Sequence, residues 1–414
     1  MVQLLFFLLS VIFSGVNKHV TVNAIELPPR SVFVDPFQFS VLGANATFRE
    51  STFQGPFFNP TATDPPFFQI FDIAFLDVIG EQPTINEVAF NAPFAFAHEA
   101  PIYVAETEEV FFASNDGGPL GNSDINHNNQ VGKISMKAVE DALSGVLTGT
   151  AVNVPITELD LPDTVQMTNG GTGTYKSNLI LAAEGRGELP SSIVLVNPKP
   201  PHNATVLLDN YYGRQFNSLD DIKVHPSGKF YFTDAPFGFL KAVRPPPMMV
   251  NQVYVFDPDT RVVRVAATDF DKPNGIAFTA DGKTAYVQPF VLIVCSTDSG
   301  ASQHSLGDDQ TRPATIYAFD VDPKSSVLQN RRVFVYDDAG IPDGLQVDSE
   351  GRVYAGCGDG VHVWNNNGDL LGKIFIGNVT ANFVFAGDGR LVMLSETKIF
   401  VAHIAAKGNP PPFP

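Results

Sequence analysis

The stretch IKVHPSGKFYFTD at residues 222–234 decides the fold, because its pattern recurs along the chain. The pattern is a short strand, a turn that contains glycine, and a second strand. It returns in IAFTADGKTAYVQ (276–288), LQVDSEGRVYAGC (345–357) and FVFAGDGRLVMLS (383–395). Apolar and polar residues alternate on both sides of an Asp-Gly, Ser-Gly or Glu-Gly turn, which is the local pattern of a β-hairpin.

Two weaker copies precede these four, IYVAETEEVFFAS (102–114) and GTYKSNLILAAEG (173–185). Six copies at spacings of roughly 40 to 70 residues suit blades of four strands each. We therefore predict an all-β fold, a six-bladed β-propeller over residues 91–406 that follows an N-terminal extension. One short helix is expected around residues 135–144, in a loop between strands.

The two ends of the chain have distinct compositions. The run from Leu4 to Val16 is apolar and too short to span a bilayer, so residues 1–24 are predicted to be a signal peptide. Residues 25–90 are rich in Phe and Pro, and part of this extension is expected to add an outer strand that closes the propeller. The tail KGNPPPFP (407–414) is predicted to be disordered.

Three glycosylation sequons, at Asn45, Asn203 and Asn378, agree with secretion. The formal net charge of −18 disfavours nucleic acid and anionic lipid as partners, and suits a hard cation or a neutral small molecule. No second apolar run is long enough for stable membrane association. Cys295 and Cys357 could form one disulfide, whereas two isolated cysteines exclude a thiolate zinc site. The oligomeric state is left open.

Each repeat carries a polar residue or a small polar cluster just before its first strand. These residues are Glu99, Asn169, Asp220 with Asp221, Asn274, Asp343 and Asn382. Any one of them alone is most simply a turn residue. Because equivalent positions of successive blades converge on the central channel, their repetition in one register instead predicts a shared site. Carboxylate and amide oxygens are hard ligands suited to Ca²⁺, and histidine is absent from these six positions.

Three sequence motifs resemble those of a known family and follow one another in the same order along the chain. They are NSLDDIKVHPSGKFYFTDAPFG, KPNGIAFTADGKTAYV and GIPDGLQVDSEGRVYAGCGDGVHVWNNNGDLLGKI. Residues 95–400 resemble the gluconolactonase family, which includes regucalcin, and the signal peptide with a long extension resembles the secreted fungal lactonohydrolases. The resemblance implies a six-bladed propeller that opens lactones with Ca²⁺ or another divalent cation such as Zn²⁺, Mn²⁺ or Mg²⁺.

Matched to the family's motifs, the metal ligands are Glu99, Asn274 and Asp343. Asp220 stands fourth, where the family usually has Asn, and it adds a negative charge. The family also commonly reads Glu-Gly-Pro where this chain reads Glu99-Ala100-Pro101.

The resulting hypothesis is a secreted, metal-dependent lactonase acting on a hydroxylated γ- or δ-lactone. Asp343 or Asp220 would deprotonate the attacking water, and Asn169 and Arg186 would bind substrate. His98 is a weaker candidate for the base. Two alternatives are a calcium-dependent arylesterase- or phosphotriesterase-like hydrolase and a propeller that binds a ligand without catalysis. The chain has no Gly-x-Ser-x-Gly motif, which argues against a serine hydrolase.

Overall fold

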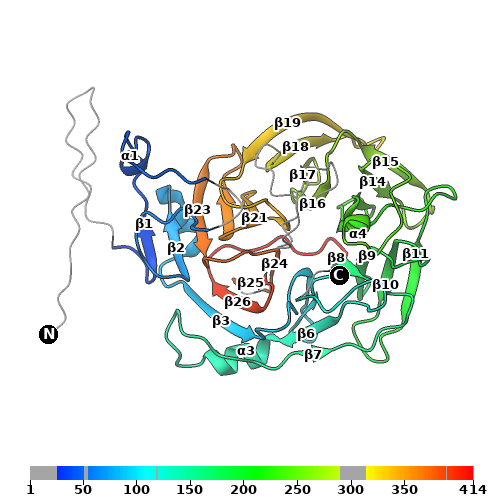
Figure 1. The fold of residues 1–414 in the computed structure, drawn as a ribbon, viewed down its shortest axis with the longest axis horizontal. Helices are drawn as coiled ribbons and strands as arrows, with labels where there is room; N and C mark the ends of the chain where they lie inside the picture. Colours follow the sequence, from blue (N-terminus) through cyan, green and yellow to red (C-terminus); the bar gives the residue numbers. More distant parts are fainter. Residues whose placement is uncertain (1–25, 51–54, 118–119, 290–313, 388, 414) are drawn as a thin grey trace.

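Six β-sheets stand around a central channel as the blades of a propeller (Figure 1). The computed structural model describes residues 26–50, 55–117, 120–289, 314–387 and 389–413. The predicted signal peptide and Cys295 lie outside these residues. The innermost strands contact one another in a closed ring, in the order β4, β8, β12, β16, β20, β24 and back to β4. The predicted six-bladed β-propeller is thereby confirmed.

The blades follow one another along the chain. Blade 1 holds β4 (Glu99–Val104), β5 (Glu109–Ala113), β6 (Val131–Ser135) and β7 (Thr157–Glu158). Blade 2 holds β8 (Thr168–Tyr175), β9 (Asn178–Ala183), β10 (Ser192–Val196) and β11 (Ala204–Leu208). Blade 3 holds β12 (Leu219–Val224), β13 (Phe230–Asp234), β14 (Gln252–Phe256) and β15 (Val263–Ala267).

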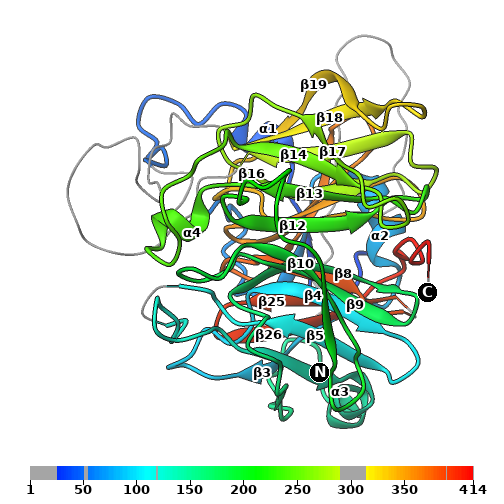
Figure 2. The same cartoon turned by 90° about the vertical axis from the view of Figure 1, so that its right-hand side faces the viewer.

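The second half of the ring repeats this order. Blade 4 holds β16 (Pro273–Phe278), β17 (Thr284–Pro289), β18 (Thr315–Val321) and β19 (Leu328–Tyr336). Blade 5 holds β20 (Leu345–Val347), β21 (Val353–Cys357), β22 (Gly360–Trp364) and β23 (Leu370–Phe375). Blade 6 holds β24 (Asn382–Phe385), β25 (Arg390–Ser395), β26 (Lys398–His403) and β3 (Thr84–Phe90). The side view shows the strands stacked blade upon blade (Figure 2).

The six sequence repeats are the inner hairpins of the six blades, each made of a blade's first two strands. In the strong copies a glycine takes the turn in the left-handed region, with φ of 84° at Gly228, 68° at Gly282 and 82° at Gly351. In the copy 102–114 the non-glycine Glu108 takes this conformation with φ of 53°. Only glycine adopts such angles without steric cost. The missing glycine explains why this hairpin gives a weaker sequence signal.

Strand β3 closes the ring, because it comes from the N-terminal extension yet completes the last blade. It pairs antiparallel with β26, from Thr84 opposite His403 to Phe90 opposite Lys398. The two ends of the propeller are thus held together by a backbone hydrogen-bond ladder and leave no open seam between the first and last blades.

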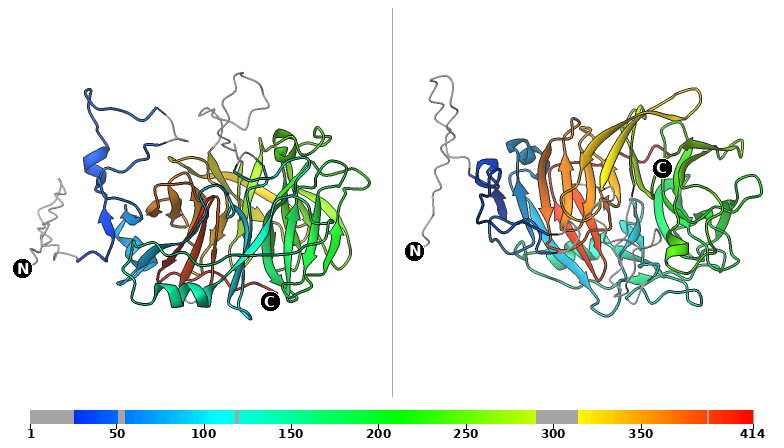
Figure 3. Two further views of the ribbon diagram at one scale, coloured as in Figure 1. Left: turned by 60° about the horizontal axis from the view of Figure 1, so that its bottom comes forward. Right: turned by 45° about the horizontal axis from the view of Figure 1, so that its top comes forward.

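The extension also widens blade 5. β2 (Phe67–Ile70) pairs antiparallel with β23, and β1 (Ser31–Phe33) pairs parallel with β2, so this sheet has six strands. Figure 3 shows these segments on the outside of the ring. The helical segments are short: α1 (Pro36–Phe39), η1 (Ile73–Phe75), α2 (Leu76–Ile79), α3 (Met136–Leu143) and α4 (Phe237–Leu240). α3 is the helix that the sequence predicted.

The core is divided among the interfaces between blades, and each neighbouring pair encloses its own apolar cluster. Strands such as β13 are therefore buried along their whole length, because both faces of the sheet are covered by other blades. Because the space between the blades is filled by apolar side chains, polar side chains of different blades can meet mainly near the ends of the inner strands. No helix in the described part of the chain is long and apolar enough to cross a membrane.

In the structure, residues 408–413 of the tail predicted to be disordered lie against the propeller. Gly408 forms a bridge with Asp348, and the ring of Phe413 packs edge-on against Tyr175 at 5.9 Å between centroids. Residues 408–412 line a cavity together with the later parts of the inner strands, such as Lys223–Val224 and Gln346–Val347. The tail has little regular structure, and it is held by this aromatic contact together with hydrogen bonds to the inner strands and turns.

Candidate active site

The six predicted positions all lie at or just before the starts of the inner strands, at the end of the channel away from the tail. In four blades the inner strand carries a β-bulge at this point. The bulges fall between Glu99 and Ile102, Thr168 and Gly171, Leu219 and Ile222, and Pro273 and Ile276. A bulge changes the direction of a side chain without ending the strand. The repeated bulge explains how equivalent residues of neighbouring blades turn toward one place.

Glu99 and Asp343 form the centre of this site. Both are buried, and their carboxylates lie with the ring of His98 in a group whose ligand atoms are within 4.8 Å of one another. Asn382 of the last blade donates to Glu99 Oε2 at 2.8 Å. A side chain at position 344 would collide with the Asn382 amide, so Asp343 has to be followed by glycine.

Ala100 has a φ of 51°, in the left-handed region. This conformation supplies the physical reason for a glycine at that position in the family's Glu-Gly-Pro motif. The chain keeps the same backbone with alanine.

His98 is held as a cation. Its Nδ1 lies 2.7 Å from Glu396 Oε1, and Asn115 binds the other oxygen of Glu396 at 3.0 Å. Burial alone would lower the pKa of His98, but the charges of Glu396, Glu99 and Asp343 outweigh it and raise this pKa to about 10. A protonated imidazole cannot accept a proton, so the structure argues against His98 as the general base.

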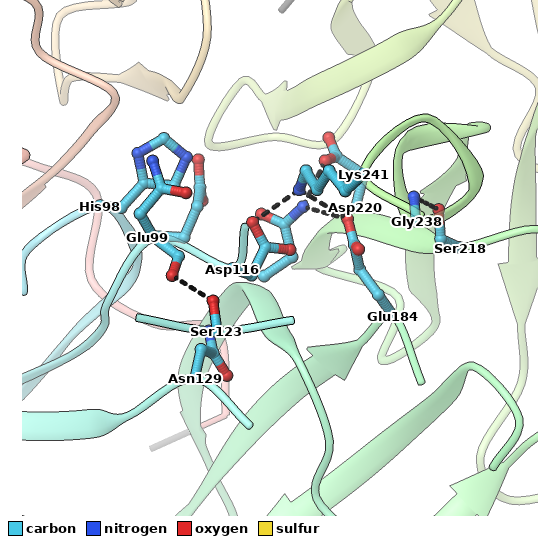
Figure 4. A network of polar contacts seen from close by, with 12 residues as sticks. His98, Glu99, Asp116, Ser123, Asn129, Glu184, Ser218, Asp220, Gly238 and Lys241 are labelled. Carbon is cyan, nitrogen blue, oxygen red and sulfur yellow. Dashed lines mark hydrogen bonds and ion pairs between the residues drawn. The ribbon is translucent and has the colours of Figure 1, made fainter. Parts of the chain in front are cut away.

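A second group of polar side chains continues the site, and sequence reasoning missed most of it. Lys241, at the end of α4, points toward Asp116 and Glu184 (Figure 4), with its Nζ at 2.6 Å from Asp116 Oδ1 and 3.0 Å from Glu184 Oε1. Asn169 joins this group to Asp220, since its amide donates to Glu184 at 3.0 Å and to Asp220 Oδ1 at 2.7 Å. Asp116, Glu184 and Lys241 come from three blades and share no motif.

The electrostatics of the whole site are dominated by negative charge. Burial raises the pKa of Glu99, Asp220 and Asp343, and the neighbouring carboxylates raise it further at Asp220 and Asp343. Burial and the nearby Asp116 raise the pKa of Glu184 to about 8, against the opposing effect of Lys241. Crowded buried carboxylates resist ionisation unless a cation joins them.

Two further positions have mainly structural contacts. Asp221 accepts from the backbone N–H groups of Ile222 at 2.8 Å and Ile276 at 3.0 Å, so it ties the bulge of blade 3 to blade 4. Arg186 lies at the rim, where it donates to Gln166 and to the carbonyl of Ile125, both at 2.8 Å. Within the described residues Arg186 makes no ion pair with the acidic cluster.

Asn274 is buried at the bulge of β16. Its backbone carbonyl accepts from Thr233 at 2.8 Å, which fixes its strand against blade 3.

A family model described as "SMP-30/Gluconolactonase/LRE-like region" matches residues 99–397. The chain belongs to this family. Its matched part begins at Glu99 and covers all six inner strands.

Three similar proteins illustrate the likeness. A lactonohydrolase, oryL, of Aspergillus oryzae is 28% identical over 325 residues, which are 74% of this chain and 67% of that protein. A solved gluconolactonase from Xanthomonas campestris has a TM-score of 0.60 at 22% identity and covers 81% of this chain and 94% of its own. A solved calcium-binding protein, regucalcin of Agrobacterium tumefaciens, has a TM-score of 0.53 at 15% identity, over 79% and 97% of the two chains. The two solved structures establish a common fold.

The residues present fit a divalent cation of the hard class. The site offers carboxylate oxygens from Glu99, Asp220 and Asp343, which are the hard donors that Ca²⁺ prefers. Asp220 Oδ2 is buried and has no hydrogen-bond partner. A buried carboxylate oxygen without a partner is costly, and a cation is the natural way to satisfy it.

Proposed function

We propose that this protein is a metal-dependent lactonase that hydrolyses a hydroxylated γ- or δ-lactone to its hydroxy acid. The observation that carries the proposal is the gathering of Glu99, Asp220 and Asp343, all buried, at one end of the propeller channel. Membership in the family and the names of its lactone-hydrolysing relatives support the reaction class. The proposed cation is Ca²⁺, held by Glu99, Asp220, Asn274 and Asp343.

When bound, such a cation polarises the lactone carbonyl and stabilises the negative charge that develops on its oxygen. Asp343 is the proposed base, because its carboxylate lies beside Glu99 in the buried site and because burial and the charge of Glu99 raise its pKa, which makes the carboxylate more basic. It takes a proton from water as the new C–O bond forms. The ring ester bond then breaks, and the leaving alkoxide takes this proton from Asp343, which returns to its carboxylate form. His98, as a fixed cation, partly offsets the effect of burial on the pKa of Glu99 and Asp343, and so favours their ionised forms rather than moving a proton itself.

The polar group around Lys241 is the proposed place for the substrate's hydroxyls. Asn169 and Asp220 supply an amide and a carboxylate on the side of the site that faces away from His98. The Asn169 amide N–H groups are taken by Glu184 and Asp220, so substrate hydroxyls would donate to the carboxylates and to the amide oxygen of Asn169. A region rich in such acceptors suits a polyhydroxylated ring better than an aryl group. Arg186 remains a proposed contact for a larger substrate at the rim.

The test is acid release by the purified protein on a panel of aldonolactones, beside aryl esters and an organophosphate. We expect turnover of the hydroxylated lactones, its loss after chelation, and its return with Ca²⁺. Glu99→Gln and Asp343→Asn should remove most of it, while Glu158→Gln on the exposed strand β7 serves as the matched control.

Other outcomes would replace parts of the proposal. Activity that survives verified metal removal would refute the metal-dependent mechanism. Preference for aryl esters or organophosphates would identify an arylesterase- or phosphotriesterase-like enzyme. A protein that binds a lactone without turning it over would be a ligand-binding propeller.

Secretion and glycosylation complete the proposal. Asn45, Asn203 and Asn378 are all exposed, as attachment of a glycan requires. Expression in a secreting host should release a chain that begins near residue 25 and loses mass with an endoglycosidase. Retention of an unprocessed N-terminus would contradict this localisation.

A further inference from the structure

A second cluster of metal-ligand side chains lies outside the channel site, in blade 5 beneath the N-terminal extension. It consists of Asp337, which follows β19, Cys357 at the end of β21, and His362 in β22. All three side chains are buried, and one ligand atom of each lies within 4.8 Å of the others. The cluster offers a carboxylate oxygen, a thiol sulfur and an imidazole nitrogen.

Two of the atoms in this cluster that could bind a metal ion have no hydrogen-bond partner. His362 Nδ1 and Asp337 Oδ1 are only 2.6 Å apart, yet neither has a hydrogen-bond partner, because their orientation is wrong for one. The other oxygen of Asp337 is used, since it accepts from the N–H of Ala339 at 3.2 Å. Buried polar atoms without hydrogen bonds are rare in folded proteins and call for a ligand that satisfies them.

The surroundings of His362 orient its ring in the way that metal-binding histidines require. Its Nε2 lies 2.5 Å from Asp359 Oδ1, and Asp359 is in turn 3.2 Å from Lys373 Nζ. A ligating histidine usually donates its second ring N–H to a carboxylate, which fixes the tautomer and makes the free nitrogen a better ligand. With Nε2 as the donor to Asp359, Nδ1 keeps a lone pair that is available to a metal ion.

The charges around the cluster also suit a divalent ion. Lys373 neutralises part of the nearby charge, with its Nζ at 2.7 Å from Asp338 and 3.2 Å from Asp359. The carboxylate of Asp337 and a thiolate at Cys357 then supply two negative charges for a doubly charged cation. Asp337 and His362 border a groove of about 520 Å³ that Trp364 also lines, which provides a path for entry.

We propose that Asp337, Cys357 and His362 bind a borderline divalent transition-metal ion such as Zn²⁺. The mixed nitrogen, oxygen and sulfur donors select this class over the hard cation proposed for the all-oxygen channel site. Bonds of about 2.0 to 2.3 Å require the Asp337 and His362 side chains to separate by roughly 1 Å. Two isolated cysteines cannot by themselves form a thiolate zinc site, but the fold brings His362 and Asp337 to Cys357.

The test uses the mature chain, stripped with a chelator, then loaded with Ca²⁺ and titrated with Co²⁺ as a spectroscopic stand-in for Zn²⁺. Wild-type protein should take up one equivalent of Co²⁺ with a thiolate-to-cobalt charge-transfer band, which Zn²⁺ displaces. Cys357→Ser and His362→Gln should lose the band. Cys295→Ser and the channel variant Asp343→Asn should keep it.

Far-ultraviolet circular dichroism checks that each variant is folded, and thermal unfolding gives a second readout. Zn²⁺ should raise the Tm of wild-type protein and leave that of Cys357→Ser unchanged. Absence of the band in folded wild-type protein, its dependence on Cys295, or a Cys295–Cys357 disulfide found by mass spectrometry would each overturn the proposal. None of these readouts depends on lactone hydrolysis, so the two proposals fail separately.

Discussion

Lys241 lies buried between Asp116 and Glu184, with only 5% of its side chain exposed. Its charge offsets carboxylates that would otherwise stand unpaired in a region of low dielectric constant. Removal of one partner of a buried ion pair costs more free energy than the intact pair contributes to stability. The reason is that the remaining charge stays buried without a partner. Lys241 therefore limits the effect of the extra negative charge that Asp220 brings to the site.

Replacement of Lys241 by Met tests this role. We expect the free energy of unfolding to fall by about 3 to 5 kcal/mol, since Asp116 and Glu184 lose their cation. Urea unfolding monitored by fluorescence measures the change. The matched control is Lys137→Met, whose ion pair with Asp141 is exposed and should leave the unfolding midpoint unchanged. Equal effects of the two substitutions would refute the argument.

The raised pKa values of the site predict how stability depends on pH in the metal-free protein. Glu184 has an ordinary pKa of 4.5 and a folded value of about 8, so folding takes up protons between these values. The stability that the protonated acid provides below pH 4.5 is lost as the pH rises toward 8. His98, with a pKa of about 10, acts in the same direction at higher pH, since its charged form stabilises the fold and is lost through that value.

Urea unfolding at pH 5, 7 and 9 in a chelator should therefore show falling stability with rising pH. Saturating Ca²⁺ should make the free energy of unfolding less dependent on pH, because the cation neutralises the negative charge of the carboxylates. A metal-free protein whose stability rises over the same interval would contradict the assigned pKa directions.

Strand β3 is the element on which ring closure depends. Its residues Ile85 and Val88 are fully buried, in the clusters on the two sides of blade 6. The strand therefore contributes both a hydrogen-bond ladder to β26 and apolar packing to two interfaces. A chain that loses these contacts has an open seam where the first and last blades meet.

Ile85→Ala should lower the free energy of unfolding by about 2 to 5 kcal/mol, through lost burial and a cavity between blades 5 and 6. Thermal and urea unfolding measure the effect. Leu147→Ala serves as the control, because Leu147 is 79% exposed and its truncation leaves no cavity. A change in stability no larger than the control's would show that β3 does not hold the ring.

The molecule as a whole has a channel whose two ends differ. The acidic site lies at the starts of the inner strands, and the C-terminal tail covers their other ends. Hydrogen bonds hold the tail at both ends, since Ser349 N–H donates to the carbonyl of residue 407 and Lys176 N–H to that of Phe413. Substrate is therefore expected to enter only at the acidic end.

Removal of residues 407–414 tests this asymmetry. We expect a lower Tm, because Phe413 leaves its contacts with Tyr175, and faster hydrogen exchange in the strands that the tail covers. The kcat/KM for the lactone should stay unchanged, since the site is at the opposite end. A truncated chain with strongly reduced kcat/KM and an unchanged fold would show that the tail acts on the site. Phe413→Ala is the milder companion variant, with an expected cost of about 1 kcal/mol for its partly buried ring.

The sequence alone was enough to predict the propeller and to single out Glu99, Asp343 and Asp220 as candidates at the starts of the inner strands, because hairpins are local and their repetition sets the register of each blade. The same local reasoning could not find the contacts of the tail, because Tyr175 and Ser349, which it meets, are distant in sequence. It also missed Asp116 and Lys241, which lie in loops outside the repeats, and Glu184, which stands near the end of the weak copy 173–185. Their ion pairs exist only after the ring has closed, since Coulomb interactions depend on distance in space and not on separation along the chain. The meeting of Asp337, Cys357 and His362 likewise depends on the packing of β19 against blade 5, which no pattern of residues encodes.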